Sequence, residues 1–318
     1  MKLIKPSFEI LEQSLGEEGI YKQVEKVGRV CWKSESKITE DSYKKFVEML
    51  KSKGHGAMLE HGTVYLKVED IVDEYGRVFS SSLKGSYSIN PYSFVTSEFY
   101  EQQPNELQSE FCSKITRSTE YITTNYRVLV ENNWLDDLKY LCEPTEYHEK
   151  RVTVKFICDR GVWNEFIRHR TLQRIDDCEV YLVDYDAEQN NSFAQESTRY
   201  CNYSKDKFNN EITFIQPSWC ENIEESKWDV RNITPEMIVH DSLIRAERNY
   251  NLLIKEGWKP QQARQVLPNA LKTELVMTGF VSDWKHFFEL RDDKDHAHPD
   301  AYTLAHPLHE EFIKRGYL

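Results

Sequence analysis

The residues best suited to chemistry are arginines in two short segments near the middle of the chain. Arg168-His169-Arg170 ends one apolar-periodic segment, and the segment 192–200, SFAQESTRY, carries Arg199 next to its last position. Adjacent helical residues point about 100° apart, so Arg168 and Arg170 flank His169 and can grip different groups at once. Hydroxyls, an amide, a carboxylate and a guanidinium in one short segment suit ribose and phosphate oxygens. Together the segments predict a pocket for a phosphorylated ligand.

Each of these features also has a simpler interpretation. A basic triplet at a helix end is favoured by the helix dipole alone, and the segment 192–200 is also compatible with a polar surface loop. Arg264, in ARQVLP, and Arg291, in FFELR, lie beside apolar runs, where an unpaired guanidinium would be costly to bury. Either each has a carboxylate partner or each faces an anionic ligand, and the residues alone leave both possibilities open.

Composition narrows the class of protein. The 318 residues carry a formal net charge of −12, which argues against sequence-independent nucleic-acid binding and means that small anions need local arginines. No segment approaches the roughly 18–20 uninterrupted apolar residues of a membrane span, and the first residues lack the apolar core of a signal peptide. The seven cysteines are scattered and never spaced as C-x-x-C. They indicate reduced thiols, and we expect a cytoplasmic protein without membrane or nucleic-acid partners.

Histidines raise the question of a metal site. His55 and His61 enclose Glu60, and the end of the chain holds His296, His298, His306 and His309, but neither spacing completes a recognisable ligand set. We expect no metal and interpret these histidines as structural or hydrogen-bonding. The chain also lacks the G-x-G-x-x-G, P-loop and G-x-S-x-G motifs, so a Rossmann dehydrogenase, a P-loop NTPase and an α/β-hydrolase each lose their main support.

No repeat or linker divides the chain, so residues 1–318 are expected to form a single α/β domain. The pattern predicts strands at 27–32, 64–68, 151–157 and 273–281, and a long polar loop over 70–100. It predicts helices at 41–51, within 109–141, at 162–170 and around 243–253, the last ending near Gly257. Pro260 opens a helix that ends near Pro268, Ser282 caps a helix running to Arg291, and a short tail follows from about 300.

These segments together resemble the flavin-dependent thymidylate synthases. That family's signature is R-H-R, a two-residue gap, and then a Ser followed by an E/Q-x-S-x-R-Y segment. Arg168-His169-Arg170 and the segment 192–200 look like its two halves, with supporting motifs around His61, Arg264 and Arg291 in the same order over roughly residues 25–300. The resemblance implies a mixed α/β (α+β) fold in which helices flank a central mixed or antiparallel sheet.

The resemblance implies reductive methylation of dUMP to dTMP, with methylenetetrahydrofolate as carbon donor and FAD, reduced by NADPH, as hydride carrier. No cysteine nucleophile is needed in this family. It also implies a homotetramer whose sites are shared between subunits.

The same resemblance assigns roles to individual residues. Arg291 would lie by the pyrimidine as the catalytic residue, favouring the N3-deprotonated form of the ring. His61 would lie near the flavin and folate pocket. The residues expected at FAD are Thr63, Arg168, His169, Arg170, Gln195 and His286. Those expected at dUMP are Glu165, Arg168, Gln195, Glu196, Ser197, Thr198, Arg199, Arg264 and Arg291.

Three departures from the family pattern leave alternatives open. The gap after Arg170 holds an insertion at about 172–191, Gln195 stands where Glu is frequent, and Phe280 stands where many members have Asn. A catalytically silent flavin- or nucleotide-binding relative, in which the insertion blocks the folate or NADPH approach, is one alternative. A metal-dependent hydrolase using the histidine clusters is another, and it predicts bound metal.

Overall fold

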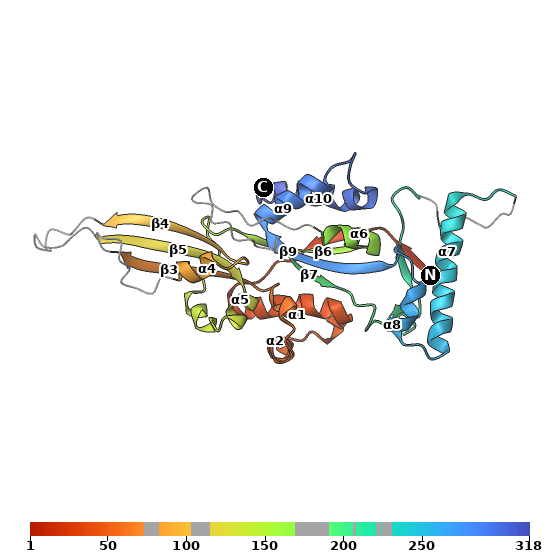
Figure 1. The fold of residues 1–318 in the computed structure, drawn as a ribbon, viewed down its shortest axis with the longest axis horizontal. Helices are drawn as coiled ribbons and strands as arrows, with labels where there is room; N and C mark the ends of the chain where they lie inside the picture. Colours follow the sequence, from red (N-terminus) through yellow and green to blue (C-terminus); the bar gives the residue numbers. More distant parts are fainter. Residues whose placement is uncertain (73–82, 103–114, 169–190, 206–207, 221–222, 224–230) are drawn as a thin grey trace, which may run out of the picture.

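A computed structural model describes residues 1–72, 83–102, 115–168, 191–205, 208–220, 223 and 231–318. The molecule is long: a three-stranded sheet projects from one end and helix α7 (Pro235–Lys255) closes the other, with a second sheet between them (Figure 1). The expected α/β class is confirmed. None of the helices in the described ranges is both long enough and apolar enough to cross a membrane.

The central sheet has four strands in the order β2-β6-β9-β7. These are β2 (Ser7–Ile10), β6 (Arg151–Asp159), β9 (Lys272–Phe280) and β7 (Ser192–Gln195), and each neighbouring pair is antiparallel. The predictions of strands at 151–157 and 273–281 are therefore confirmed. β7 forms one edge of the sheet, so the segment 192–200 begins as a strand and leaves the sheet after Gln195.

Side chains alternate between the two faces of this sheet. Phe156 of β6 and Leu275 and Met277 of β9 are fully buried in the largest apolar core, which we call the α9 face. Helices α6 (Arg160–Phe166), α9 (Val281–Arg291) and α10 (Pro299–Lys314) cover it. Figure 1 shows all three on one side of the sheet.

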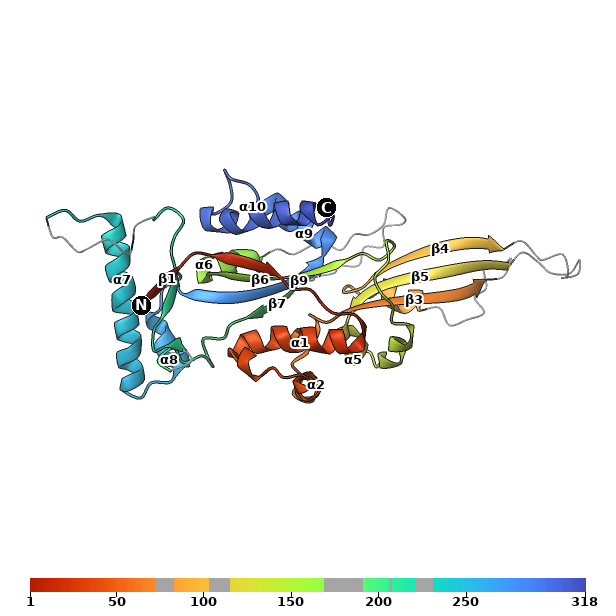
Figure 2. The ribbon, with the colours of Figure 1, turned by 180° about the vertical axis from the view of Figure 1, so that it is seen from behind.

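The opposite, α1 face is covered by an N-terminal helical layer, and Figure 2 shows α1 and α2 on that side of the sheet. Val276 of β9 and Ala194 of β7 pack there against Val27 and Val30. The layer comprises α1 (Gly16–Trp32), α2 (Ser42–Ser52) and α3 (Gly56–Leu59), with a short 3-10 turn, η1 (Glu35–Lys37). The helix predicted over 41–51 is confirmed. The strand predicted over 27–32 is wrong, because buried apolar residues recur at helical spacing from Ile20 onward.

The projecting sheet has the order β3-β5-β4, all antiparallel: β3 (Thr63–Val72), β5 (Ile115–Asn125) and β4 (Phe94–Gln102). The strand predicted at 64–68 is confirmed. A loop over all of 70–100 is wrong, since α4 (Lys84–Ser88) and β4 lie there. An edge strand such as β4 pairs through its backbone and tolerates polar side chains, which hid it from the sequence pattern.

The helical prediction within 109–141 is wrong over residues 115–125 and is confirmed only in part after them. β5 occupies most of it, and only the short α5 (Tyr126–Glu131) and η2 (Leu135–Tyr140) are helical. Residues 118–125 of β5 are all buried although most are polar, so the strand shows no apolar-polar alternation that would have revealed its period. Threonine, isoleucine and tyrosine, which fit a pleated surface, make up most of its second half.

At the far end, β1 (Lys2–Ile4) pairs in parallel with β8 (Thr213–Ile215), and both pack near α7. After α7 the chain turns at Gly257, whose φ of +90° favours glycine. α8 (Pro260–Ala263) and η5 (Arg264–Val266) follow, so the predicted opening at Pro260 and the end before Pro268 are confirmed.

Two predictions about the last segments need correction. α9 begins two residues earlier than expected, with Phe280 at the N-cap position: Asp283, not Ser282, accepts a hydrogen bond from the Phe280 backbone N–H at 2.9 Å. The residues from about 300 are no short tail, because α10 buries Leu304, Leu308 and Phe312 in the α9-face core. The apolar residues of α10 recur at helical spacing, which is the sequence signal that indicates this helix.

Candidate functional site

Two residues expected at the nucleotide, Glu165 and Arg291, meet on the α9 face. They lie 126 positions apart, at the ends of α6 and α9. Arg291 Nη1 donates to Glu165 Oε2 at 2.7 Å, and Nη2 donates to the Glu165 backbone carbonyl at 3.0 Å. The Arg291 and Glu165 side chains are 16% and 27% exposed. The pair is therefore fixed at two points and still reachable from solvent.

A third charge shapes this pair. Arg168 follows α6 by two positions, is exposed, and acts electrostatically on Arg291. Burial lowers the pKa of Arg291, Glu165 opposes that shift, and Arg168 adds to it. With two guanidinium groups and one carboxylate, the group has a net charge of about +1 at neutral pH. It can accept an anionic ligand without first losing its internal ion pair.

The segment 192–200 places neighbouring residues on opposite faces of the sheet. Gln195 Nε2 donates to Thr273 Oγ1 at 3.1 Å, and the ring of Phe193 packs against Trp163 of α6 with centroids 6.2 Å apart. Phe193 and Gln195 therefore face α6, while Ala194 and Glu196 face α1. Gln195 lies on the side of the Glu165–Arg291 pair, and Glu196 does not.

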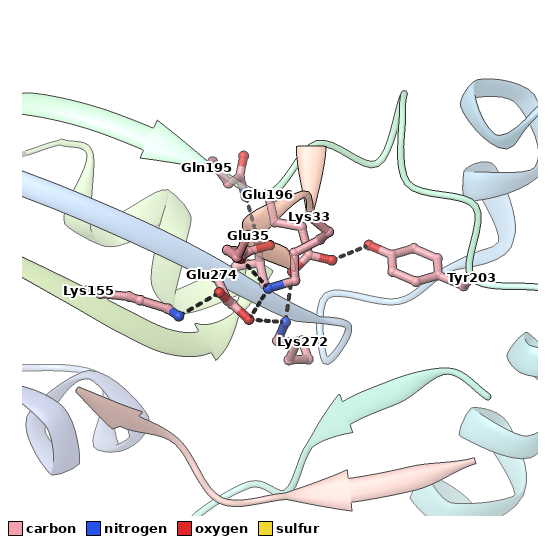
Figure 3. Close-up of polar contacts among 9 residues, drawn as sticks. Lys33, Glu35, Lys155, Gln195, Glu196, Tyr203, Lys272 and Glu274 are labelled. Atoms are coloured by element: carbon pink, nitrogen blue, oxygen red, sulfur yellow. Dashed lines mark hydrogen bonds and ion pairs between the residues drawn. The ribbon is translucent and has the colours of Figure 1, made fainter. Parts of the chain in front are cut away.

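Glu196 instead joins a buried network of charges on the α1 face (Figure 3). Its side chain is 1% exposed, accepts from Lys272 Nζ at 2.8 Å and accepts from the Tyr203 hydroxyl at 3.2 Å. The hub of the network is Glu274, whose carboxylate lies 2.6 Å from Lys33, 2.7 Å from Lys272 and 2.9 Å from Lys155. The Glu196 carboxylate is thus engaged by Lys272 and Tyr203 of its own chain.

The network has a strong electrostatic signature. Burial alone would raise the pKa of Glu274, but Lys272 and Lys33 outweigh burial and hold that pKa far below its ordinary value. The same lysines join three segments, because Lys33 follows α1, Lys155 lies on β6 and Lys272 on β9. The network thus fastens the start of the turn after β7 to the sheet. Sequence reasoning missed Lys33, Lys155, Lys272 and Glu274; the polar positions alternating along β6 and β9 were the available signal.

Beyond Glu196 the chain turns sharply. The Ser197 backbone N–H donates to the Cys31 carbonyl at 3.0 Å, which ties the turn to the end of α1. Arg264 Nη1 donates to Thr198 Oγ1 at 3.0 Å, so the structure brings together these two predicted site residues. Arg199 is exposed, and its guanidinium carbon lies 5.3 Å from the Tyr200 ring centroid. Both arginines lie at the surface without a carboxylate in these contacts.

His169, Arg170 and the insertion up to residue 190 lie outside the described residues. The described residues on either side are close, because Trp163 and Phe193 are in ring contact. Asn191, at the end of the insertion, is buried, and an added Cβ on Gly279 would lie 2.0 Å from its side-chain oxygen. A side chain at position 279 would therefore force the buried Asn191 side chain to move.

His61 and Thr63 lie deep on the α1 face. His61 Nδ1 is 2.8 Å from Thr278 Oγ1, which is 2.9 Å from Thr153 Oγ1. Burial, with a smaller effect of Arg151, lowers the pKa of His61 to about 3, so the imidazole is neutral at pH 7. Arg151, which the sequence analysis missed, is 8% exposed and donates to the Glu60 carbonyl at 3.1 Å and to Thr63 Oγ1 at 3.4 Å.

The two remaining positions of interest lie elsewhere. His286 is 38% exposed on α9, with Nδ1 3.5 Å from Glu289 Oε2. Phe280 is buried at the end of β9, and the Arg151 guanidinium carbon lies 5.5 Å from its ring centroid. Within one chain, His286, Thr63 and Arg168 do not converge on a common point, since Thr63 lies on the α1 face and α6 and α9 lie on the other.

The other chemistries considered from sequence find little support. In the part of the chain that the structure describes, no group of three or more His, Cys, Asp or Glu is arranged to hold a metal ion. Every described thiol with a resolved shift has a raised pKa, foremost through burial: Cys31 to about 11, with Cys142, Cys158 and Cys220 also raised. Such thiols are poor nucleophiles at neutral pH.

Comparison with known families bears directly on these residues. A family model described as "Thymidylate synthase complementing protein" matches residues 143–315, more than half of the 318-residue chain. The chain belongs to this family. The family resemblance seen in the sequence is thereby confirmed. The matched range contains Glu165 and the arginines at 168, 199, 264 and 291, whereas His61 and Thr63 precede it.

Solved structures of a UMP/dUMP methylase, PolB from Streptomyces cacaoi, show a distant similarity. The complex with 5-Br UMP has 15% identity and a TM-score of 0.39, with 99% of this chain and 92% of that chain covered. The complex with 5-Br dUMP has 16% identity and a TM-score of 0.37, with 99% and 93% covered. Among curated proteins, no match is found.

Proposed function

We propose that this protein is a flavin-dependent thymidylate synthase that converts dUMP to dTMP. Methylenetetrahydrofolate is the proposed carbon donor, and FAD reduced by NADPH the proposed source of the hydride. Family membership supports the reaction type. The observation that carries the proposal is the half-buried Arg291, held at two points by Glu165 beside the exposed Arg168.

Arg291 is the proposed catalytic residue. A fixed cation beside the pyrimidine favours the N3-deprotonated ring, because it stabilises the negative charge that develops there. Negative charge delocalised into the ring makes its C5 carbon more nucleophilic. Glu165 orients the guanidinium, and its own carboxylate borders the dUMP site.

The turn after β7 is the proposed phosphate and ribose site. Arg199 and Arg264 are surface guanidinium groups on or against this turn, and they suit bidentate contacts with phosphate oxygens. Ser197, Thr198 and Gln195 offer hydroxyl and amide groups. Glu196 was expected to contact dUMP, but its contacts with Lys272 and Tyr203 make support of the turn the better proposal.

FAD is the proposed cofactor, with Arg168, His169, Arg170 and Gln195 as its main protein contacts. The described members fit this role, since Arg168 is exposed and Gln195 is half-buried on the same face of the sheet. Bound FAD supplies hydride transfer, which no amino-acid side chain can perform. Thr63, His286 and His61 remain predicted neighbours of the flavin or folate.

A site shared between subunits would account for the separation of these residues in one chain. Thr63 lies on the α1 face, while Arg168, just after α6, and His286, on α9, lie on the other side. We propose a homotetramer in which residues of different subunits complete each site, with residues 1–318 forming one domain per subunit. Size-exclusion chromatography with light scattering gives the subunit number directly.

The activity itself is tested by colour and by proton release. Purified protein should show the absorbance of oxidised flavin, and should release tritium from 5-tritiated dUMP when supplied with methylenetetrahydrofolate and NADPH. A colourless protein that cannot be reconstituted with FAD would contradict the proposal. Tight dUMP binding without turnover, with turnover restored by deleting residues 172–190, would instead identify a silent relative whose insertion blocks the site.

A further inference from the structure

Two histidines of α10 converge on the residue that follows Arg291. His306 Nδ1 lies 2.8 Å from Asp292 Oδ1, and His309 Nδ1 lies 2.7 Å from Asp292 Oδ2. An ionised carboxylate only accepts hydrogen bonds, so both contacts require the tautomer with the proton on Nδ1. Asp292 is 14% exposed, whereas His309 and His306 are 32% and 46% exposed. The carboxylate is the enclosed member of the group.

Each histidine ring is itself held by an aromatic neighbour. His309 stacks on Phe288 of α9, with centroids 4.4 Å apart and planes 11° apart. His306 stacks on Tyr302, one turn earlier in α10, at 5.2 Å and 14°. These stacks restrict the rotation of both imidazole rings and so keep each Nδ1 atom directed at the Asp292 carboxylate. Glu310, 3.8 Å from His306 Nε2, is the other carboxylate at this histidine.

The last turn of α9 needs this support. The final carbonyls of a helix have no partners within the helix, and helix ends fray for that reason. Asp292 is the C-cap residue that follows α9, and its backbone N–H donates to the Phe288 carbonyl at 2.8 Å. α10 is in turn anchored in the core by Leu304, Leu308 and Phe312. A rigid helix therefore holds the turn that carries Arg291.

We propose that Asp292, His306 and His309 form a clamp that positions Arg291 for catalysis. The inference rests on the proposed function of Arg291, and it makes the three clamp members positioning residues, not catalytic ones. Glu165 fixes the guanidinium from α6, while the clamp fixes the backbone from α10. Loss of the clamp lets the last turn of α9 fray, which displaces the guanidinium from the pyrimidine without removing its charge.

The kinetic test compares two double variants. His306→Ala with His309→Ala removes both donors, whereas His306→Asn with His309→Asn keeps an amide N–H near each Nδ1 position. We expect kcat to fall about tenfold in the alanine variant and to recover to within about twofold in the asparagine variant, because small misplacements of a catalytic group are costly. The KM for dUMP should change less than about twofold in both. His296→Ala, which removes an exposed histidine paired with Asp293, is the matched control and should leave kcat unchanged.

The same variants in an Arg291→Gln background separate positioning from general damage. If the clamp acts through Arg291, the alanine pair should cause no further loss of kcat there, since the two changes then share one effect. An equal loss in both backgrounds, or a failure of asparagine to rescue, would overturn the proposal. If the wild-type protein has no synthase activity, the proposed function fails first. Hydrogen exchange at residues 288–292 then decides the clamp: exchange faster in the alanine pair supports it, and unchanged exchange overturns it.

Discussion

On the α1 face of the central sheet, the Glu274 side chain is 7% exposed and pairs with three lysines, whereas on the α9 face Arg291 is 16% exposed and pairs with Glu165 among the described residues. In the first group, each charged side chain forms an ion pair with an oppositely charged side chain of the same network. The second group is reachable from solvent, and Arg168 adds a second positive charge beside the Glu165 carboxylate. A network paired in the first way stabilises the fold, while a group of the second kind can receive an anionic ligand.

Position explains the difference between the two groups. Glu274 lies within β9, where the end of α1 and the turn after β7 cover it. Glu165 and Arg291 lie in the last turns of two short helices, α6 and α9, where the helix ends are partly exposed to solvent. Changes at Glu274 should therefore affect stability first, and changes at Arg291 activity first. Each prediction below tests this division, from the largest expected effect to the smallest.

Glu274→Gln should cause the largest loss of stability. It leaves three lysines without their central carboxylate, and breaking a buried ion pair costs about 3–5 kcal/mol. Urea unfolding followed by fluorescence measures the change. Glu48→Gln is the control: its carboxylate is 69% exposed and pairs with Lys51, so the expected change is about 0–0.5 kcal/mol. Similar losses in the two variants would show that the network is not a structural hub.

Arg291→Gln should reverse that profile. We expect kcat for the proposed reaction to fall about 100-fold, in line with the removal of one preorganised charge at a reacting centre. The free energy of unfolding should change by only about 1 kcal/mol, because its pair with Glu165 is partly exposed. Tritium release and urea unfolding on the same preparation measure both. A variant as unstable as Glu274→Gln would erase the distinction between the faces.

His61 should make the stability of the α1 face depend on pH. Its folded pKa of about 3 lies below the ordinary value of 6.5, so between these values the unfolded chain binds one more proton. Stability is then lost as pH falls below about 6.5, by about 1.4 kcal/mol per pH unit. His61→Asn removes this titration, so its unfolding free energy should fall less steeply between about pH 6.5 and 5 than that of the wild type. His296→Asn, at an 84% exposed site, should retain the wild-type slope.

Arg264→Lys should give the smallest effect. Lysine keeps the charge but lacks the planar fork that suits a phosphate. We expect the KM for dUMP to rise about tenfold, or about 1.4 kcal/mol, with kcat within about twofold. Initial rates over a range of dUMP concentrations measure both constants. A fall in kcat with unchanged KM would place Arg264 at the reacting ring and not at the phosphate.

Local patterns predicted the elements whose periodicity was clear. The alternation along 151–157 gave β6, the β-rich composition of 273–281 gave β9, and Pro260 gave the start of α8. They failed in β5, which buries serine, threonine, glutamate and asparagine side chains and so shows neither an apolar run nor an apolar-polar alternation. They also failed over 27–32, where β-branched residues read as a strand although the buried positions follow a helix from Ile20.

The candidate site was predicted in kind but not in arrangement. The apolar runs beside Arg264 and Arg291 predicted that each needs a carboxylate partner or an anionic ligand. In the structure, Arg291 pairs with Glu165, whereas Arg264 donates to the Thr198 hydroxyl. The opposite directions of Gln195 and Glu196 depend on the register of β7 with β9, which no single segment encodes. The pairing of Asp292 with α10 depends on a helix where the sequence analysis predicts only a short tail.

By itself, the sequence determined the chemical inventory: which guanidinium groups, hydroxyls and carboxylates are available, and the family they point to. Those properties are local and survive in any conformation. Only the tertiary structure decided which charges cancel and which remain open. Residues far apart in the chain, such as Glu165 and Arg291 or Lys33 and Glu274, interact strongly only after folding has brought them within about 3 Å and removed water between them.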